Sequence, residues 1–219
     1  MLQNIDWANV KNPHLFINGD CMEYMKTMPD KYVDLCICDP PYGIGINHNI
    51  GRRKGDKPSD YKKVTWDNEP PSKEYFDELL RVSQNQIIWG ANHFISLLPY
   101  DSPCWICWDK GFSPDVSFAS FEMAYTSFKS VSKRIALTSI QNDRIHPTQK
   151  PIKLYKWLLQ HYAKEGDKIL DTHVGSASSL IACYQMNFDY IGFEIDKEYY
   201  EKAQKRIADE MAQVSLFYG

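Results

Sequence analysis

The stretch Val33-Asp34-Leu35-Cys36-Ile37-Cys38-Asp39-Pro40-Pro41-Tyr42 decides the fold class of this chain. Its apolar first part predicts a buried strand over residues 33–38, which ends in a carboxylate, two prolines and an aromatic ring. Asp39 can accept a hydrogen bond from an exocyclic amine, the prolines hold their carbonyls stiffly because φ is fixed, and Tyr42 can stack on a planar base. This combination favours chemistry on the amino group of a nucleobase that has been taken out of its helix.

Strands and helices alternate on both sides of this stretch. Apolar runs predict strands over residues 15–18, 86–89, 103–108, 168–171 and 190–194, and helical spacing predicts helices over residues 22–28, 72–82, 151–162, 180–183 and 198–211. Residues 121–128 alternate loosely, which indicates an edge strand, and residues 129–145 are polar and basic. The alternation predicts an α/β fold with a mostly parallel sheet.

Length and composition limit the class of protein. The chain has 219 residues, 43% hydrophobic and 24% charged, with a net charge of −3. This length fits one large domain with its own core, or one domain with an insertion. Because there is no global basic field, any contact with nucleic acid must come from local clusters of Lys and Arg. No apolar run approaches membrane-spanning length and the N-terminus has no signal-peptide pattern, so we expect a cytoplasmic protein without membrane contact.

Six cysteines lie mostly inside apolar runs, as free thiols of cytosolic proteins do. The segment Cys104-Trp105-Ile106-Cys107 has the spacing of a metal-ligand pair, but no second such pair completes a set of four ligands. A structural strand is therefore the favoured interpretation, with a zinc site as the alternative, and we expect no metal.

A second candidate site follows the strand predicted at residues 168–171. Its sequence is Asp171-Thr172-His173-Val174-Gly175-Ser176-Ala177-Ser178-Ser179, a carboxylate followed by small residues that enter a helix. The turn after a strand of an open sheet is where nucleotide-like ligands bind, and small side chains let a ligand approach the backbone. Since Gly175 is its only glycine, this turn is neither a dinucleotide fingerprint nor a P-loop.

Glu194 ends the next strand, about 20 residues further on, where an acid can bind the hydroxyls of a ribose. A solvated strand end is the alternative interpretation of this residue. The two features together indicate a ligand that has a ribose and lacks phosphates, and S-adenosylmethionine meets that description.

With these motifs in this order, the chain closely resembles the DNA amino-methyltransferases, which methylate adenine N6 or cytosine N4. The motifs that carry the resemblance are Asn18-Gly19-Asp20-Cys21, Val33-Asp34 with Asp39-Pro40-Pro41-Tyr42-Gly43, Ile87-Ile88-Trp89-Gly90-Ala91-Asn92, Trp108-Asp109-Lys110, His146-Pro147-Thr148-Gln149-Lys150-Pro151, the turn that begins at Asp171, and Gly192-Phe193-Glu194-Ile195-Asp196. The catalytic tetrapeptide precedes the cofactor turn, and this permuted order resembles the β group of the family.

The resemblance implies a single methyltransferase domain over residues 1–219. Its sheet would have seven mostly parallel strands with helices on both faces, the Rossmann-like fold of S-adenosylmethionine-dependent methyltransferases. The strands that end at Asp39 and Asp171 would be neighbours at the centre of the sheet, so that methyl donor and extruded base meet there. In the cofactor turn, Thr172 and His173 replace the family's usual Pro-Phe, as in a known subfamily variant, and Ala177 replaces a glycine, which we expect to tighten the cofactor pocket.

The resemblance also implies roles for individual residues. The catalytic residues would be Asp39, Pro40, Pro41 and Tyr42. The cofactor-binding residues would be Asp20, Cys21, Asp39, His146, Thr148, Gln149, Lys150, Asp171, His173, Gly175, Ser176, Ser178, Glu194 and Ile195. The adenine of the cofactor is expected near Asp20, its ribose at Glu194, and its amino-acid end near Asp171 and residues 146–151.

Structural roles remain the alternative for four of these residues. Asp20 can be a turn residue after a strand, and Tyr42 can be a core aromatic. His146 and His173 are expected to shape their loops rather than to act in catalysis, because no general base is required until the methyl group has been transferred.

Double-stranded DNA is the expected partner. Residues 44–71 are polar and lack periodicity, which predicts a mobile loop that contacts DNA. The basic residues expected at phosphates are Arg52, Arg53, Lys54 and Lys57, with Lys62 and Lys63, and a second cluster of Lys129, Lys133, Arg134 and Arg144. Solvated loops are the alternative. The short segment of residues 110–145 is the expected target-recognition segment.

The predicted activity is site-specific methylation of adenine N6. Cytosine N4 enzymes more often carry Ser-Pro-Pro-Tyr, and enzymes that methylate glutamine or RNA tend toward Asn-Pro-Pro-Tyr, so Asp39 favours adenine. Cytosine N4 methylation on the same scaffold is one alternative, and a non-catalytic nucleic-acid-binding subunit is another. Many relatives dimerise, so a homodimer is expected.

Overall fold

A computed structural model describes residues 5–11, 13–45, 67, 69–98, 101–112, 119–141 and 144–218. The strands are β1 (His14–Asn18), β2 (Val33–Cys38), β3 (Ser83–Trp89), β4 (Trp105–Asp109), β5 (Phe121–Thr126), β6 (Lys133–Ala136), β7 (Lys168–Asp171) and β8 (Asp189–Glu194). The helices are α1 (Cys21–Met25), α2 (Lys73–Val82), α3 (Ile152–Tyr162), α4 (Ser178–Gln185) and α5 (Lys197–Tyr218), with short 3-10 turns η1 (Trp7–Asn9), η2 (Ala91–His93) and η3 (Ile95–Leu97).

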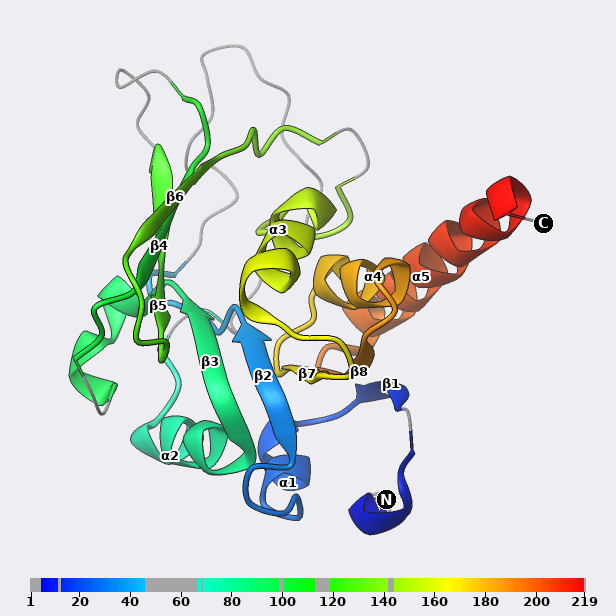
Figure 1. The fold of residues 1–219 in the computed structure, drawn as a ribbon, viewed down its shortest axis with the longest axis horizontal. Coiled ribbons are helices and arrows are strands. Elements are labelled where there is room, and N and C mark those ends of the chain that lie inside the picture. The colour runs from blue at the N-terminus through cyan, green and yellow to red at the C-terminus, as the bar shows by residue number, and fades with distance from the viewer. Residues whose placement is uncertain are drawn as a thin grey trace.

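The described strands form one sheet in the order β1-β8-β7-β2-β3-β5-β4-β6 (Figure 1). Strand β5 runs antiparallel to both of its neighbours, β3 and β4, and every other pair is parallel. This confirms the predicted α/β class with a mostly parallel sheet. The described sheet has eight strands, one more than the family resemblance implies.

Two predictions about the outer strands were wrong. Strand β5 is not at the edge, because β4 and β6 lie beyond it, and its residues Ala124, Tyr125 and Thr126 are all buried. The edge strand is β6, which lies in the polar and basic segment for which no strand was predicted. Its side chains alternate between half-buried and exposed, so no apolar run marks it in the sequence.

Strand β2 is covered on both faces, as its unbroken apolar run predicts. Leu35 and Ile37 belong to the core that the sheet forms with α3, α4 and α5, whereas Cys36 and Cys38 belong to the core formed with α1 and α2. The alternation follows from the period of two in a strand. Figure 1 shows these two groups of helices on opposite sides of the sheet.

Strands β2 and β7 are neighbours in the middle of the sheet, which confirms the expected pairing: Leu35 lies beside Ile169 and Cys36 beside Leu170. From β2 the chain continues through α2 to β3 on one side, and from β7 it continues through α4 to β8 on the other side. The gap between the carboxyl ends of β2 and β7 is therefore the topological switch point, where open α/β sheets bind ligands.

The helix boundaries have local causes. Ser72 caps α2, since its side-chain oxygen accepts a hydrogen bond from the Tyr75 amide at 3.3 Å, and Pro151 precedes the first residue of α3. Helix α5 packs on the sheet through the predicted stripe that includes Tyr199, Ala203 and Ile207. Within the described ranges, no helix combines the length and the apolar character that a membrane span requires.

Candidate active site

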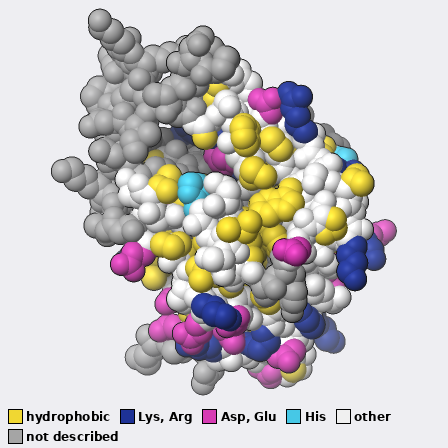
Figure 2. Space-filling model, turned by 90° about the vertical axis from the view of Figure 1, so that its left-hand side faces the viewer, with side chains coloured by type: hydrophobic (Ala, Val, Ile, Leu, Met, Phe, Trp, Pro, Cys, Tyr) yellow, Lys and Arg dark blue, Asp and Glu magenta, His cyan; other side chains and the backbone are white. Residues whose placement is uncertain are grey.

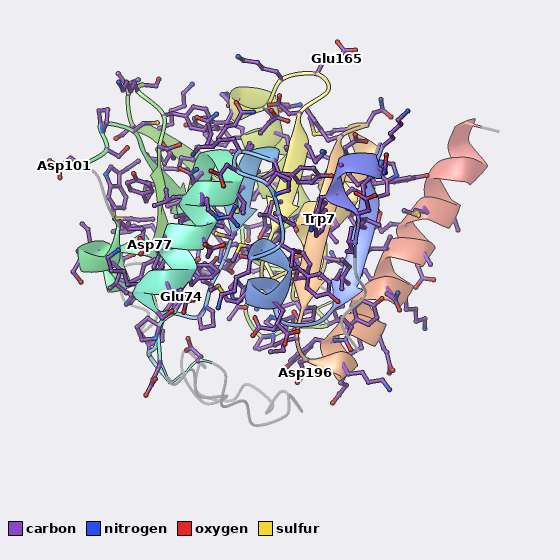
Figure 3. All side chains as sticks on the ribbon, turned by 90° about the horizontal axis from the view of Figure 1, so that it is seen from below. Trp7, Glu74, Asp77, Asp101, Glu165 and Asp196 are labelled. Carbon is purple, nitrogen blue, oxygen red and sulfur yellow. The ribbon has the colours of Figure 1, made fainter. Side chains whose placement is uncertain are left out.

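Acidic residues gather at the carboxyl edge of the parallel strands. Asp39 follows β2, Asp171 is the last residue of β7, and Glu194 is the last residue of β8. Figure 3 shows Asp196, just past β8, at this end of the sheet, and Glu165, which precedes β7, at the opposite end. The fold therefore places the two predicted sites, which are far apart in the sequence, along one edge.

The carboxylate of Asp39 is held by two side chains. Its Oδ1 accepts a hydrogen bond from the Tyr42 hydroxyl at 2.7 Å, and its Oδ2 accepts one from the Lys150 ammonium at 2.6 Å. Both donors also reach Glu122, whose Oε2 lies 2.9 Å from the Lys150 Nζ and 3.2 Å from the Tyr42 hydroxyl. The other oxygen of Glu122 pairs with Lys110 at 2.5 Å. Two carboxylates and two ammonium groups thus form one network at the end of β2.

Burial and charge act against each other in this network. Burial lowers the pKa of the Lys150 ammonium, but Asp39 and Glu122 outweigh it and hold that pKa above its ordinary value. Burial raises the pKa of Glu122, but Lys150 and Lys110 outweigh it and lower that pKa to about 2. Burial, with the charge of Glu122, raises the pKa of Asp39 despite the opposing effect of Lys150. Lys150 therefore stays cationic while it is shared by two acids.

The ring of Tyr42 is packed tightly. It stacks on His93 with 5.1 Å between ring centroids, and it lies so close to Gly90 that a side chain on this glycine would place its Cβ 2.0 Å from the ring. Asp67 holds the backbone of the motif, because its Oδ1 accepts hydrogen bonds from the amides of Tyr42 at 2.7 Å and Gly43 at 3.1 Å. The ring is thus held between His93 and Gly90, and the backbone that carries it is held by Asp67.

The turn after β7 surrounds a buried carboxylate. Asp171 accepts hydrogen bonds from the His173 amide at 3.0 Å and from the Ser179 hydroxyl, and burial raises its pKa to about 7. Gly175 and Ala177 both have positive φ, at 53° and 63°. Glycine adopts this left-handed conformation without strain. This agrees with the expectation from the family resemblance that Ala177 stands where a glycine is usual.

Glu194 lies beside the end of β1, where it pairs in register with Asn18. Its two side-chain oxygens each accept a backbone hydrogen bond, from Gly175 at 2.9 Å and from Asp196 at 2.9 Å. A carboxylate with this geometry keeps lone pairs for further donors. Asp20, also at this edge, is exposed and caps α1 by accepting a hydrogen bond from the Met22 amide at 2.9 Å. Cys21 is buried, and Ile195 is exposed.

The segment of residues 146–151 closes the site from the side of α3. The His146 ring packs edge-on against Tyr199, and its Nδ1 lies 3.0 Å from the Thr148 hydroxyl. Gln149 holds its own loop, since its side-chain oxygen accepts a hydrogen bond from the Ile145 amide at 3.0 Å. Burial lowers the pKa of His146 to about 4, and burial does the same for His173.

Sequence reasoning assigned no role to three residues that hold the site. Glu122 lies on β5, and Arg206 lies on α5. Lys110, quoted only as part of the motif Trp108-Asp109-Lys110, directly follows β4. Arg206 is buried and donates hydrogen bonds to the Ser176 carbonyl at 2.7 Å and to the Ser178 hydroxyl at 2.9 Å. An Arg within the apolar stripe of α5 was the available signal for this last residue.

The predicted DNA-contacting residues are described only in part. Arg52, Arg53, Lys54 and Lys57, with Lys62, Lys63 and most of the loop predicted at residues 44–71, lie outside the described residues. Lys133 and Arg134 lie on β6, where Arg134 is exposed and forms an ion pair with Asp109 at 2.5 Å. Figure 2 shows the face that carries the outer strands, where the described Lys and Arg side chains lie mainly toward the margins with Asp and Glu among them.

The residues at the ends of β7, β8 and β1 fit the predicted cofactor. Ser176 and Ser178 are small and buried, α4 begins without a side-chain cap, Asp171 offers a buried acid for a cationic group, and Glu194 retains acceptor capacity for hydroxyls.

The described part of the chain contains no group of three or more His, Cys, Asp or Glu side chains arranged to hold a metal ion, and its cysteines are free thiols.

Comparison with known proteins identified similar methylases. Residues 88–205, more than half of the chain, match a family model described as DNA methylase, of the N6/N4 type. The chain is 26% identical over 212 residues to YubD, a proposed methylase of Escherichia coli (strain K12), covering 88% of this chain and 89% of that protein. It is 25% identical over 240 residues to the type II methyltransferase M.HpaI of Haemophilus parainfluenzae, covering 89% and 74% of the two chains.

The fold has solved counterparts. The crystal structure of M1.HpyAVI in complex with S-adenosylmethionine superposes with a TM-score of 0.57 at 19% identity, covering 88% of this chain and 98% of that one. At this level of identity, the superposition establishes that the two proteins share a fold.

Proposed function

This chain belongs to the DNA methylase family of N6/N4 type, and on that premise we propose that it methylates N6 of an adenine extruded from double-stranded DNA. The cofactor is S-adenosylmethionine. One observation carries the proposal: the acid of the tetrapeptide, Asp39, and the acid of the small-residue turn, Asp171, lie at the carboxyl ends of neighbouring central strands at the switch point. A donor held at one and an amine held at the other would meet between them.

The chain's own side chains suit the activation of an aromatic amine. The lone pair of such an amine is delocalised into the ring, which makes the nitrogen a poor nucleophile. Hydrogen bonds from its two N–H groups to the Asp39 carboxylate and the Pro40 carbonyl would favour a pyramidal nitrogen as positive charge develops. Tyr42, fixed by Gly90 and His93, would hold the plane of the base.

S-adenosylmethionine supplies a methyl group bonded to a cationic sulfur. The amine nitrogen would form the new C–N bond while the electron pair of the breaking C–S bond stays on sulfur, and the nitrogen would then lose one proton to the Asp39 carboxylate or to solvent water. Asp171 and Glu194 would hold the cationic end and the ribose of the cofactor, and Arg206 would keep the turn between them in place.

Adenine is preferred over cytosine because the first residue of the tetrapeptide is Asp39 rather than Ser. The family model spans both amines, so cytosine N4 remains the other possible product. The family model, described as DNA methylase, supports DNA as the substrate. Phosphate contacts by Lys133 and Arg134, and by the basic residues Arg52, Arg53, Lys54 and Lys57, are part of the proposal.

Methylation of DNA of mixed sequence, followed by mass spectrometry of the nucleosides, tests the proposal. We expect N6-methyladenine with the wild-type chain. The Asp39→Ala variant should bind S-adenosylmethionine in calorimetry and lose methylation, because the acceptor for the amine is removed while Asp171 and Glu194, the proposed cofactor acids, are unchanged. N4-methylcytosine would identify the alternative base. Cofactor binding without any product would indicate a non-catalytic subunit, and near-normal turnover of Asp39→Ala would remove the proposed role of that residue.

A further inference from the structure

The two side chains that donate hydrogen bonds to the Asp39 carboxylate each have a second acceptor nearby. The Lys150 ammonium and the Tyr42 hydroxyl each contact Asp39, and each also lies within 3.2 Å of one oxygen of Glu122. Each oxygen of Asp39 now accepts one of these hydrogen bonds, so the amine of a target base must share the carboxylate with these two donors or displace one of them. A buried ammonium that lost its only acceptor would be strongly destabilised, so the position of Glu122 is significant.

The surroundings of Lys150 explain why a second acceptor is needed. Its side chain is only 3% exposed, and its Nζ lies 5.4 Å from the ring centroid of Trp89 and 5.8 Å from that of Tyr42. Water cannot readily replace a lost carboxylate in such a place. Glu122 is itself anchored, since Lys110 holds its other oxygen at 2.5 Å. The network contains two cations and two anions, so the arrival of a neutral amine leaves its charge balanced.

We propose that Lys150 and Glu122 form a positioning pair for Asp39: Lys150 occupies the catalytic carboxylate until the target amine arrives, and Glu122 then takes over the Lys150 ammonium. This inference rests on the proposed function and adds two positioning residues to it. No covalent step is involved, because hydrogen bonds are exchanged between acceptors that lie side by side. Lys150, expected from the sequence at the amino-acid end of the cofactor, acts here on the acceptor of the base.

The topology places Glu122 where this role requires it. Strand β5 is antiparallel to β3 and β4, so its beginning lies at the edge where the parallel strands end. Glu122 is its second residue and pairs in register with Trp108. A parallel strand in this place would have brought its last residue to the site, and Glu122 would lie at the opposite edge.

The Glu122→Gln variant is the first test. A neutral amide is a poor acceptor for the ammonium, so Lys150 should stay on Asp39 and compete with the amine. We expect the single-turnover rate of methylation to fall by about 10- to 100-fold, the range for one lost charge-assisted hydrogen bond, with unchanged affinity for S-adenosylmethionine. Glu78→Gln, which removes the same charge from the ion pair of Glu78 with Arg81 on α2, is the matched control and should leave the rate unchanged.

The pH profile of that rate distinguishes positioning from a merely structural role. The groups that face Asp39 are Lys150, Glu122, Tyr42, Asp171 and Tyr155. In Glu122→Gln the Asp39 carboxyl loses one neighbouring negative charge, which lowers its pKa. The acid limb of the pH–rate profile, which reports the ionisation of Asp39, should therefore move to lower pH. In the Lys150→Met/Glu122→Gln double variant Asp39 also loses the neighbouring cation, which had lowered its pKa. The acid limb should therefore move to higher pH than in the wild type. Unshifted limbs, or a Glu122→Gln rate within threefold of wild type, would overturn the proposal.

A stability cycle tests the shared ion pair without any activity. Lys150→Met alone leaves two buried carboxylates without their common cation and should lower the melting temperature sharply. Adding Glu122→Gln should restore much of that loss. If the double variant is no more stable than Lys150→Met, the two carboxylates do not share this ammonium and the proposal fails. A wild-type protein that forms no methylated base would refute the proposed function instead, and the cycle would still decide the pairing.

Discussion

Gly90 lies against the ring of Tyr42 so closely that a Cβ on this glycine would be 2.0 Å from the ring carbon Cε1. Gly90 also has φ of 67°, and its amide donates a hydrogen bond to the Met123 carbonyl at 2.9 Å. The end of β3 is therefore shaped to seat the aromatic ring of the catalytic motif. Only glycine meets both requirements, the close approach and the left-handed backbone.

Gly90→Ala should displace the Tyr42 ring and reduce methylation by about 10²-fold, because a shift of about 1 Å in a positioned group can cost that much. The left-handed alanine should also lower stability by about 1–2 kcal/mol. Gly166→Ala is the control for the backbone effect alone: Gly166 has φ of 84° and open space around its Cβ position, so this variant should lose about 1–2 kcal/mol of stability and keep its activity. Equal methylation rates for the two variants would show that activity does not depend on the close packing of the Tyr42 ring against Gly90.

Arg206 on α5 should support the cofactor turn. Arg206→Met removes the hydrogen bonds to Ser176 and Ser178, which should cost about 1.5–3 kcal/mol of folding free energy and weaken S-adenosylmethionine binding about tenfold. Denaturant unfolding and calorimetry measure the two effects. Lys205→Met, at the preceding exposed position of the same helix, is the control and should change neither. Unchanged cofactor affinity in Arg206→Met would separate this arginine from the site.

Asp171 should make cofactor binding depend on pH near neutrality. Burial raises its pKa to about 7, and a cationic ligand binds the ionised form. The affinity for S-adenosylmethionine should therefore weaken about tenfold as the pH falls from about 8 to about 6, where the free protein is mostly protonated at this position. Asp171→Asn should bind weakly at both pH values, and the exposed Asp77→Asn should retain the wild-type dependence. A pH-independent affinity of the wild-type chain would contradict this assignment.

The sequence predicted the central part of the fold because its signals there are local. The apolar run that ends at Asp39 marks β2 with its observed bounds, and the small residues after Asp171 mark the entry to α4. In these places one short segment carries both the strand and its ligand-facing turn. That the strands ending at Asp39 and Asp171 are neighbours was implied by the family resemblance. The roles of the individual site residues remain predictions.

The outer strands and the network around Asp39 could not be predicted in the same way. Strand β6 has no apolar run, and β5 alternates too loosely to reveal that strands flank it on both sides. Glu122 comes to the catalytic edge only because β5 is antiparallel, a property of the assembled sheet. Contacts made between residues 111 positions apart, as between Asp39 and Lys150, leave no periodic signal in the sequence.

His146 and His173 should make the protein acid-sensitive. Burial lowers the pKa of each to about 4 in the folded protein, against about 6.5 in an unfolded chain. The unfolded state thus binds protons first as the pH falls, so stability is fully present above about 6.5 and is lost progressively toward about 4. Each histidine should cost about 2 kcal/mol of unfolding free energy between about pH 7.5 and about pH 5. Urea unfolding at these two values should show a smaller loss in His146→Asn and in His173→Asn than in wild type. The exposed His161→Asn on α3 should behave as wild type, and equal losses in all four proteins would mean that neither buried ring is held neutral by the fold.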